Sequence, residues 1–169
     1  FRYTRIPENG GVGTDSTFDR SFDLRYRMLD EGRFGVLTPA IAVGLQDFIG
    51  TGKLASEYIV ASKTITPAIT ASVGLGWGRL GSRNGFTNPL GVFDSGLETR
   101  ESLNFGFGGK PSLDQFFHGD VALFGGVSWD YSDKLTLKAE YSSDAYTREA
   151  ANGTIDASSP LNFGVSYRW

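Results

Sequence analysis

The most constraining feature of the sequence is a long two-sided stretch, Thr17 to Arg33, in which apolar and polar residues alternate. One set of alternating positions is apolar except for Arg20: Phe18, Phe22, Leu24, Tyr26 and Met28. The other set is polar or charged: Asp19, Ser21, Asp23, Arg25 and Arg27. Because successive side chains of a strand point to opposite faces, this pattern predicts a strand with one apolar and one ionic face. It is roughly twice the usual strand length, which favours a sheet with lipid on one side and water on the other.

The same alternation recurs along the chain and predicts eight strands. The seven other expected strands are Phe1–Ile6, Val36–Phe48, Glu57–Ile65, Ala68–Leu80, Asp120–Tyr131, Leu135–Ser142 and Leu161–Trp169. In most of them one face is apolar and the other carries Gly, Ala, Ser and charged residues. Glu57–Ile65 is the least regular, and there we expect Tyr58 and Val60 to face outward.

The connections between these strands alternate in length. Short turns are expected at Asp30–Arg33, Thr66–Pro67 and Ser132–Lys134. Longer, polar segments are expected at Pro7–Ser16, Ile49–Leu54, Gly81–Gly119 and Asp144–Pro160. Outer-membrane barrels have short periplasmic turns and long outside loops. The alternation requires that Leu103–Gly108, a further alternating run, belongs to the long outer loop.

These patterns predict an all-β fold, an antiparallel up-and-down transmembrane β-barrel of about eight strands or a section of a larger barrel. We expect residues 1–169 to form a single domain or barrel section, with a long outer loop at about 81–119. The sequence opens within a strand, so we expect a piece of a longer protein. On this orientation Arg20 lies near the outer end of its strand, where an outward charge costs little.

The predicted faces assign roles to two sets of residues. A lumen would be lined by charges of both signs: Asp19, Asp23, Arg25, Arg27, Glu57, Lys63, Asp130, Lys138, Glu140 and Arg168. Two membrane-interface girdles would contain Tyr58, Trp77, Trp129, Tyr131, Tyr141, Tyr167 and Trp169. Mixed charges can pair across strands and fill a narrow barrel, or they can line a polar path for a sugar polymer. We favour structural pairing for any single charge.

Composition excludes several classes of protein. The chain has 16 basic and 19 acidic residues, so no basic excess attracts nucleic acid. It has no Cys, which excludes disulfides and thiolate metal sites. No apolar run approaches the roughly 20 residues of a transmembrane helix. A mean hydropathy of -0.20 is compatible with a barrel, because alternation keeps the average modest.

No motif predicts catalysis, a metal or a cofactor. Residues 76–81 satisfy the dinucleotide pattern G-x-G-x-x-G, but breaker-rich sequence follows where the motif requires a helix. His118 is the only histidine and is best interpreted as a loop residue. Asp94, Glu98 and Glu101 lack the spacing of a calcium loop. We therefore expect a protein that is not an enzyme.

Two other classes stay open. A soluble β-sandwich also alternates, and such a module could bind polysaccharide through exposed Trp77 and Trp129. A barrel enzyme acting on lipid or glycan would need a nucleophile–base pair at the rim, which the sequence does not offer. Strand length, loop asymmetry and the small residues of the polar face favour the barrel over the sandwich.

Several long blocks resemble a known family. They are RYTRIPENGGVGTDSTFDRSFDLRYRMLDEGR, PAIAVGLQDFIGTG, GLGWGRLG, VALFGGVSW and LKAEYSSDAY, and they span Arg2 to about Tyr167. They resemble the YjbH-type family, which includes the related group 4 capsule protein GfcD. The resemblance implies the bacterial outer membrane, a β-barrel and exopolysaccharide or capsule export or assembly. It implies contact with outer-membrane lipid and lipopolysaccharide, and with polysaccharide and other proteins of the export locus. The family's proteins are much longer than 169 residues, which favours a section of a larger wall.

Overall fold

The computed structural model describes residues 2–7, 16–49, 54–101, 115–151, 153 and 158–169 of the 169-residue chain. Strands dominate it. They are β1 (Arg2–Pro7), β2 (Ser16–Leu29), β3 (Ala40–Ile49), β4 (Ser56–Thr66), β5 (Ile69–Gly78), β6 (Val121–Asp130), β7 (Leu135–Tyr141) and β8 (Leu161–Tyr167). Short helical turns occupy η1 (Arg79–Gly81), η2 (Pro89–Val92), η3 (Ser95–Glu98) and α1 (Thr147–Ala151). The predicted all-β class is confirmed, and the predicted Leu103–Gly108 run lies outside the described residues.

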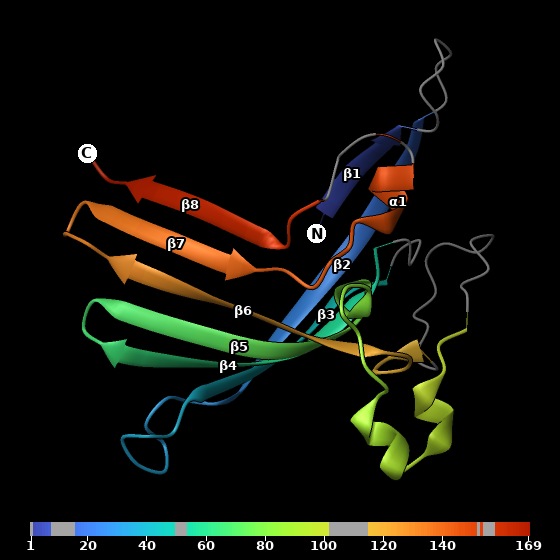
Figure 1. The fold of residues 1–169 in the computed structure, drawn as a ribbon, viewed down its shortest axis with the longest axis horizontal. Helices are drawn as coiled ribbons and strands as arrows, with labels where there is room; N and C mark the ends of the chain where they lie inside the picture. Colours follow the sequence, from blue (N-terminus) through green and yellow to red (C-terminus); the bar gives the residue numbers. More distant parts are fainter. Residues whose placement is uncertain (1, 8–15, 50–53, 102–114, 152, 154–157) are drawn as a thin grey trace.

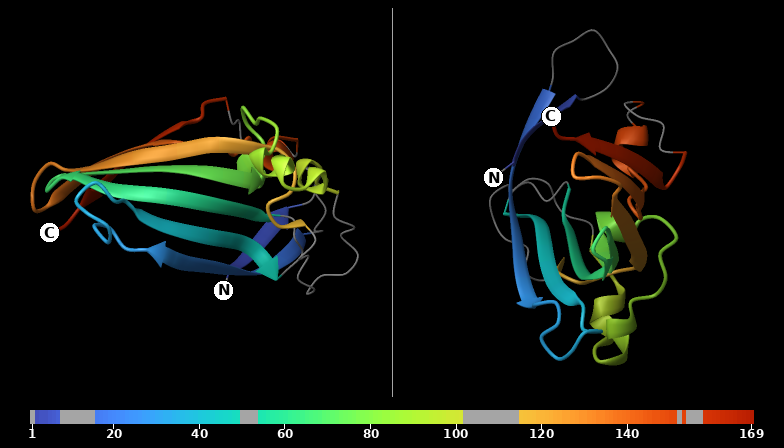
Figure 2. Two further views of the ribbon diagram at one scale, coloured as in Figure 1. Left: turned by 90° about the horizontal axis from the view of Figure 1, so that it is seen from below. Right: turned by 90° about the vertical axis from the view of Figure 1, so that its left-hand side faces the viewer.

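The eight strands follow one another in chain order, each antiparallel to the next (Figure 1). The 14-residue β2 serves two partners: its first part pairs with β1 and its second part with β3. From β2 to β8 the ladder is continuous and strongly curved. Figure 2 shows the sheet as a trough, with β2 on one wall and β7 and β8 on the other.

The sheet is not closed. In the described part of the chain β1 and β8 lie at opposite ends of the strand order and do not pair with each other. Of the two alternatives that the sequence leaves open, a barrel closed by these eight strands alone is not observed in the described residues, and a section of a larger barrel stays a prediction. Seven neighbouring pairs in sequence order leave two free edges, so the structure is an open, curved antiparallel sheet.

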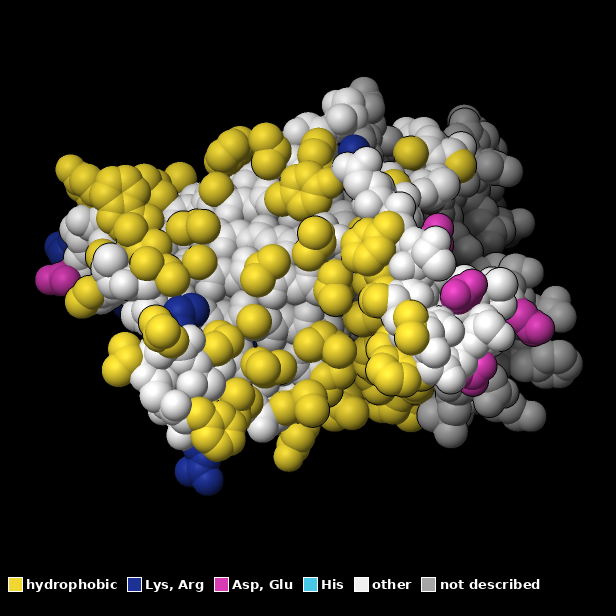
Figure 3. All heavy atoms as spheres, turned by 60° about the horizontal axis from the view of Figure 1, so that its bottom comes forward, with side chains coloured by type: hydrophobic (Ala, Val, Ile, Leu, Met, Phe, Trp, Pro, Cys, Tyr) yellow, Lys and Arg dark blue, Asp and Glu magenta, His cyan; other side chains and the backbone are white. Residues whose placement is uncertain are grey.

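The two faces of the trough differ in chemistry as the alternation predicts. The convex face carries exposed apolar side chains, including Leu24, Val73, Leu123, Phe163 and Val165. The last two are 78% and 73% exposed. Figure 3 shows apolar side chains spread over this face. In the described part of the chain no second sheet covers it.

The concave face is built on glycines covered by neighbouring aromatic rings. Tyr58 on β4 is paired with Gly76 and its ring lies over Gly44 of β3, while the ring of Phe124 on β6 lies over Gly74 of β5. The two rings meet edge to face with centroids 6.0 Å apart. Rings packed over glycines fill the volume that the small residues leave, as in aromatic rescue of strand glycines.

This packing predicts a specific sensitivity. Gly74→Ala is expected to lower the free energy of unfolding by about 1–3 kcal/mol, the usual cost of overpacking. A Cβ there would lie 2.8 Å from the backbone oxygen of Ile59 and would overlap the Phe124 ring. Gly164→Ala is the matched control, since its Cβ would sit 3.6 Å from the Lys138 Cβ in ordinary contact. Urea unfolding of both variants in the same detergent measures the change in the free energy of unfolding. Equal losses for Gly74→Ala and Gly164→Ala would contradict close packing of the Phe124 ring on Gly74.

Two predicted connections differ from those observed. β3 begins at Ala40, so Val36–Pro39 is not strand and the expected short turn at Asp30–Arg33 extends to residue 39. Gly32 and Gly35 adopt φ of 78° and 126° within it, conformations that favour glycine. Pro39 cannot donate to a ladder, which is the physical reason that the strand starts after it. The five-residue α1 lies within the segment predicted to be a polar loop.

Candidate functional site

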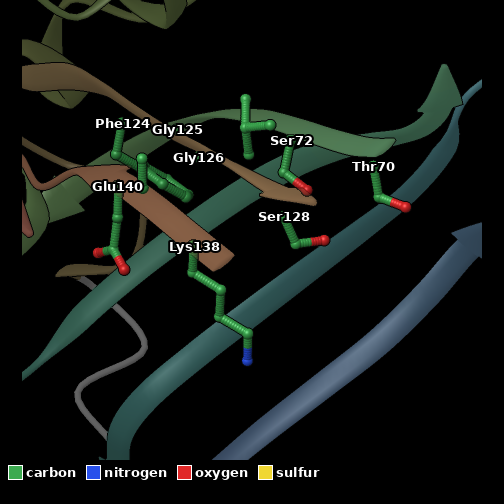
Figure 4. A pocket seen from close by; sticks show the side chains of 10 residues that line it. Thr70, Ser72, Phe124, Gly125, Gly126, Ser128, Lys138 and Glu140 are labelled. Atoms are coloured by element: carbon green, nitrogen blue, oxygen red, sulfur yellow. The ribbon is translucent and has the colours of Figure 1, made fainter. Parts of the chain in front are cut away.

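The concave face contains a hollow of about 370 Å³ between β5, β6 and β7. Its lining comprises Thr70, Ser72, Phe124, Gly125, Gly126, Val127, Ser128, Lys138, Ala139 and Glu140. Figure 4 shows the hydroxyl and charged side chains projecting from the strands on one side. A volume of this size falls within the range of small-ligand pockets. The hollow offers a ligand several hydroxyl groups, one cation, one anion and one aromatic ring.

The register places five of the ten predicted lumen charges on the concave face. Arg25 and Arg27 of β2 lie opposite Gly44 and Ala42 of β3. On the other wall, Asp130, Lys138 and Glu140 pair with residues of the same face: Thr136, Ser128 and Gly126. A second hollow, of about 610 Å³, lies at the end of the trough and includes Asp130, Asp133 and Arg168. The structure therefore brings Lys138 and Glu140 together in one hollow and Asp130 and Arg168 in another.

Asp19 and Asp23 both lie on β2. The backbone of Asp19 pairs with Thr4, and its side chain is outside the described set. The carboxylate of Asp23 accepts a hydrogen bond from the backbone N–H of Asp47 at 2.9 Å. Asp47 has a φ of 52°, so Asp23 supports an irregular end of β3.

The face assigned to β4 from the sequence is wrong. Register with β3 and β5 puts Tyr58 and Val60 on the concave face with Gly44 and Gly76. Glu57 and Lys63 consequently lie on the convex face. The physical reason is volume: the glycines flanking Tyr58 leave room that only a large ring fills, whereas both charges obtain partners near the ends of β4.

Glu57 is fully buried on the convex face by the connection between β5 and β6. The Arg100 guanidinium donates to both of its carboxylate oxygens, at 2.7 and 3.0 Å, and the backbone N–H of Phe117 donates at 3.2 Å. The Phe117 ring packs edge to face against Trp77, with centroids 5.1 Å apart. Trp77 is 1% exposed, so it does not lie in an exposed aromatic girdle. This bidentate pair fastens the β5–β6 connection over one end of the convex face.

A second cluster of charges joins η1 to the segment after β7. Arg79 forms ion pairs with Asp144 and, at 2.7 Å, with Glu149, and its guanidinium lies 5.1 Å from the Tyr146 ring centroid. Burial alone would lower the pKa of Arg79, but the hydrogen bond and attraction from Asp144, with those from Glu149, raise it above its ordinary value. Ser143 donates to the Leu80 backbone oxygen at 2.5 Å. These contacts hold residues 142–149 against the end of β5.

Lys63, at the opposite end of β4 from Glu57, pairs with Glu31 of the β2–β3 connection at 2.7 Å. Glu31 also accepts from the backbone N–H and hydroxyl of Thr64, both at 3.0 Å. The Lys63 hydrogen bond, followed by that of the Thr64 backbone, lowers the pKa of Glu31. Glu31 therefore holds the connection to β4 while it is ionised, and this contribution is lost as the pH falls through its lowered pKa.

Four of the predicted interface aromatics lie toward one end of the sheet. Trp129 and Tyr131 contact edge to face at 5.4 Å, and both are exposed. Tyr167 and Trp169 are also exposed, and β8 pairs with β7 so that Tyr167 lies opposite Leu135. Tyr141 lies toward the other end of β7, where its hydroxyl accepts a hydrogen bond from Asn84 at 2.7 Å. Four exposed aromatic side chains therefore lie toward one end of the convex face, and Tyr141 is separate from them.

The remaining sequence candidates have local contacts. His118 Nδ1 lies 2.9 Å from the Phe116 backbone oxygen, and Asp94 caps η3 by accepting from the Gly96 N–H. Across the described ranges no group of three or more His, Asp or Glu side chains is arranged to hold a metal. Glu98 and Glu101 belong to the same connection between β5 and β6. The first two glycines of the G-x-G-x-x-G pattern end β5, and the third closes the three-residue 3-10 turn that follows.

Comparison with known proteins gives a family. Residues 1–169 match the family model YjbH, described as "Exopolysaccharide biosynthesis protein YbjH". The chain belongs to this family. Over 156 residues it is 36% identical to the protein named "Uncharacterized lipoprotein YjbH" of Escherichia coli (strain K12). That alignment covers 91% of this chain and 22% of the relative, so the chain spans about a fifth of that protein's length. No solved structure matches.

Several residues of these sites carry no signal in the sequence. Arg100 and Phe117 come from a long irregular segment whose position over Trp77 no periodicity reveals. Phe124 is recognisable only as an exception to the alternation of its strand, and its partner Gly74 explains the exception. None of the described helices is long and apolar enough to cross a membrane.

Proposed function

We propose that this YjbH-family chain forms part of the wall of an outer-membrane β-barrel that takes part in exopolysaccharide export or assembly. In this proposal the protein is a scaffold or conduit and not an enzyme. Its partners are outer-membrane lipid and lipopolysaccharide, the polysaccharide and other proteins of the export locus. The supporting observation is the sidedness of the sheet: an exposed apolar convex face and a concave face of small and charged residues.

The open edges fit a wall completed by further strands. β1 and β8 each leave one side unpaired in the described residues, and exposed strand edges are a liability in any finished fold. The E. coli relative is several times longer than this chain. We propose that strands from the rest of the whole protein continue the wall from both edges, because a membrane-spanning sheet must close.

Membrane assembly of the full-length protein tests this proposal. We expect it to fractionate with outer membranes, to need detergent for extraction and to run faster on gels before heating than after it. Deletion of its gene is expected to reduce the exopolysaccharide that reaches the cell surface. A full-length protein that stays monomeric in buffer without detergent would rule the barrel out.

A second candidate is a module outside the membrane that binds polysaccharide, and the charges of β4 favour it. Glu57 and Lys63 lie six positions apart on the convex face, about 20 Å at the usual rise per residue. An outer-membrane barrel usually presents an apolar band about 25 Å tall. Burial of Trp77 removes it from the expected binding surface and leaves Trp129. Recovery of the full-length protein in the soluble fraction would favour this candidate.

A further inference from the structure

We propose that the concave hollow between β5, β6 and β7 is a binding subsite for an oligosaccharide segment of the exopolysaccharide. The inference rests on the proposed function, which brings a glycan to this face, and it specifies where the glycan binds. The hollow is open along the trough, a shape that suits a segment of a longer chain. Its lining joins hydroxyls, a cation, an anion and a ring within about 370 Å³.

The charged pair is available to a ligand. Lys138 and Glu140 occupy alternate positions of β7, so both side chains project from the concave face, as Figure 4 shows. In the described part of the chain neither side chain forms an ion pair or a hydrogen bond, although five other ion-pair contacts are present. An ammonium group donates hydrogen bonds to sugar hydroxyls and a carboxylate accepts them. The pair can therefore bind two neighbouring hydroxyls, one as acceptor and one as donor.

The neighbouring strands supply weaker hydrogen-bonding groups. Thr70 and Ser128 lie opposite each other across β5 and β6, and their hydroxyls make no side-chain hydrogen bond to other described residues. Ser72, next along this face, shares a hydrogen bond of 2.8 Å with Ser62 and keeps further accepting capacity. Together these hydroxyls continue the polar surface from Lys138 across to β5.

The apolar component is Phe124. Its ring lines the hollow and is fixed from behind by Gly74 and from the side by Tyr58. A sugar ring has an apolar face of C–H groups, which packs on an aromatic ring while its hydroxyls reach polar side chains at the edge. Because the Phe124 ring is already held in place, ordering it on binding costs little.

Binding of oligosaccharides to the full-length protein in detergent tests the site. The probe is a set of oligosaccharides of defined length, released by mild acid from the producing strain's own exopolysaccharide, with calorimetry as the readout. Removing both charges in Lys138→Ala/Glu140→Ala is expected to raise Kd about tenfold or more, as loss of charged hydrogen bonds predicts. Phe124→Leu is expected to raise Kd as well while the detergent-solubilised protein stays folded.

The matched control is Arg33→Ala/Glu101→Ala, which removes one charge of each sign at exposed positions that line neither hollow. We expect its Kd to stay within twofold of the parent. Equal affinities for the Lys138/Glu140 variant and the control would overturn the assignment, as would absence of binding by the parent protein. Membrane fractionation separates the two proposals: a protein that enters the outer membrane without binding oligosaccharide fails only this inference, and one that stays soluble fails the proposed function.

Discussion

Replacing Arg100 with alanine is expected to lower the free energy of unfolding by about 3–5 kcal/mol, the usual cost of breaking a buried ion pair. The substitution would leave the fully buried Glu57 carboxylate with the Phe117 N–H as its other described donor. It would also release the connection that covers Trp77. Urea unfolding in detergent, followed by tryptophan fluorescence, measures the loss.

Two variants show whether burial of the charge is the cause. Lys63→Ala breaks the more exposed pair with Glu31 at the other end of β4 and is expected to cost much less. Glu57→Leu/Arg100→Leu removes both charges and is expected to restore most of the stability, because apolar residues often replace buried pairs at little cost. If Arg100→Ala and Lys63→Ala lower the free energy of unfolding equally, the buried ion pair does not hold the β5–β6 connection against the sheet as we describe.

Placing a charge on the convex face is the second substitution with a large expected effect. Val127→Arg is expected to destabilise the membrane-assembled protein by about 2–4 kcal/mol if this position lies near the middle of the bilayer. Val127 is 46% exposed and pairs with Ala71 and Ala139 on the same face. Its arginine would face acyl chains, which cannot solvate it. The yield of heat-modifiable protein in outer membranes measures the effect.

Ser128→Arg is the matched control because Ser128 is the next residue of β6 and faces the trough. A long cationic side chain there can reach water along the open concave side, so assembly is expected to be close to that of the parent. If both variants assemble equally well, the convex face does not contact lipid.

The alternation of residue types predicted much of the fold. Strand existence and order followed from period-2 patterns, and β5, β6 and β8 lie within the ranges expected. The glycine-rich face was also visible in the sequence, because Gly74, Gly76 and Gly126 recur on one side of their strands. Closure was not predictable, because the pairing of β1 and β8 depends on the curvature of the whole sheet.

Alternation of apolar and polar residues predicted the wrong face where side-chain volume or a partner distant in the sequence decides which way a side chain points. In β4 the rule that large apolar residues face outward conflicted with the need to fill space beside Gly44, and Tyr58 turned inward. The sequence predicts that Glu57 lies on the polar face, because nothing in the sequence indicates its partner. That partner, Arg100, lies 43 positions away in an irregular connection. Trp77 was expected at an exposed girdle, and the same connection buries it.

The most direct test of the account is quenching of fluorescence by lipids brominated on their acyl chains. Two single-tryptophan reporters on adjacent positions of β8, Phe163→Trp and Asn162→Trp, place the probe on the convex and concave faces in a full-length background whose other tryptophans are phenylalanine. In vesicles of brominated lipid we predict strong quenching for Phe163→Trp and little for Asn162→Trp. Equal quenching of the two reporters, or none of either, would contradict contact between the convex face and the acyl chains.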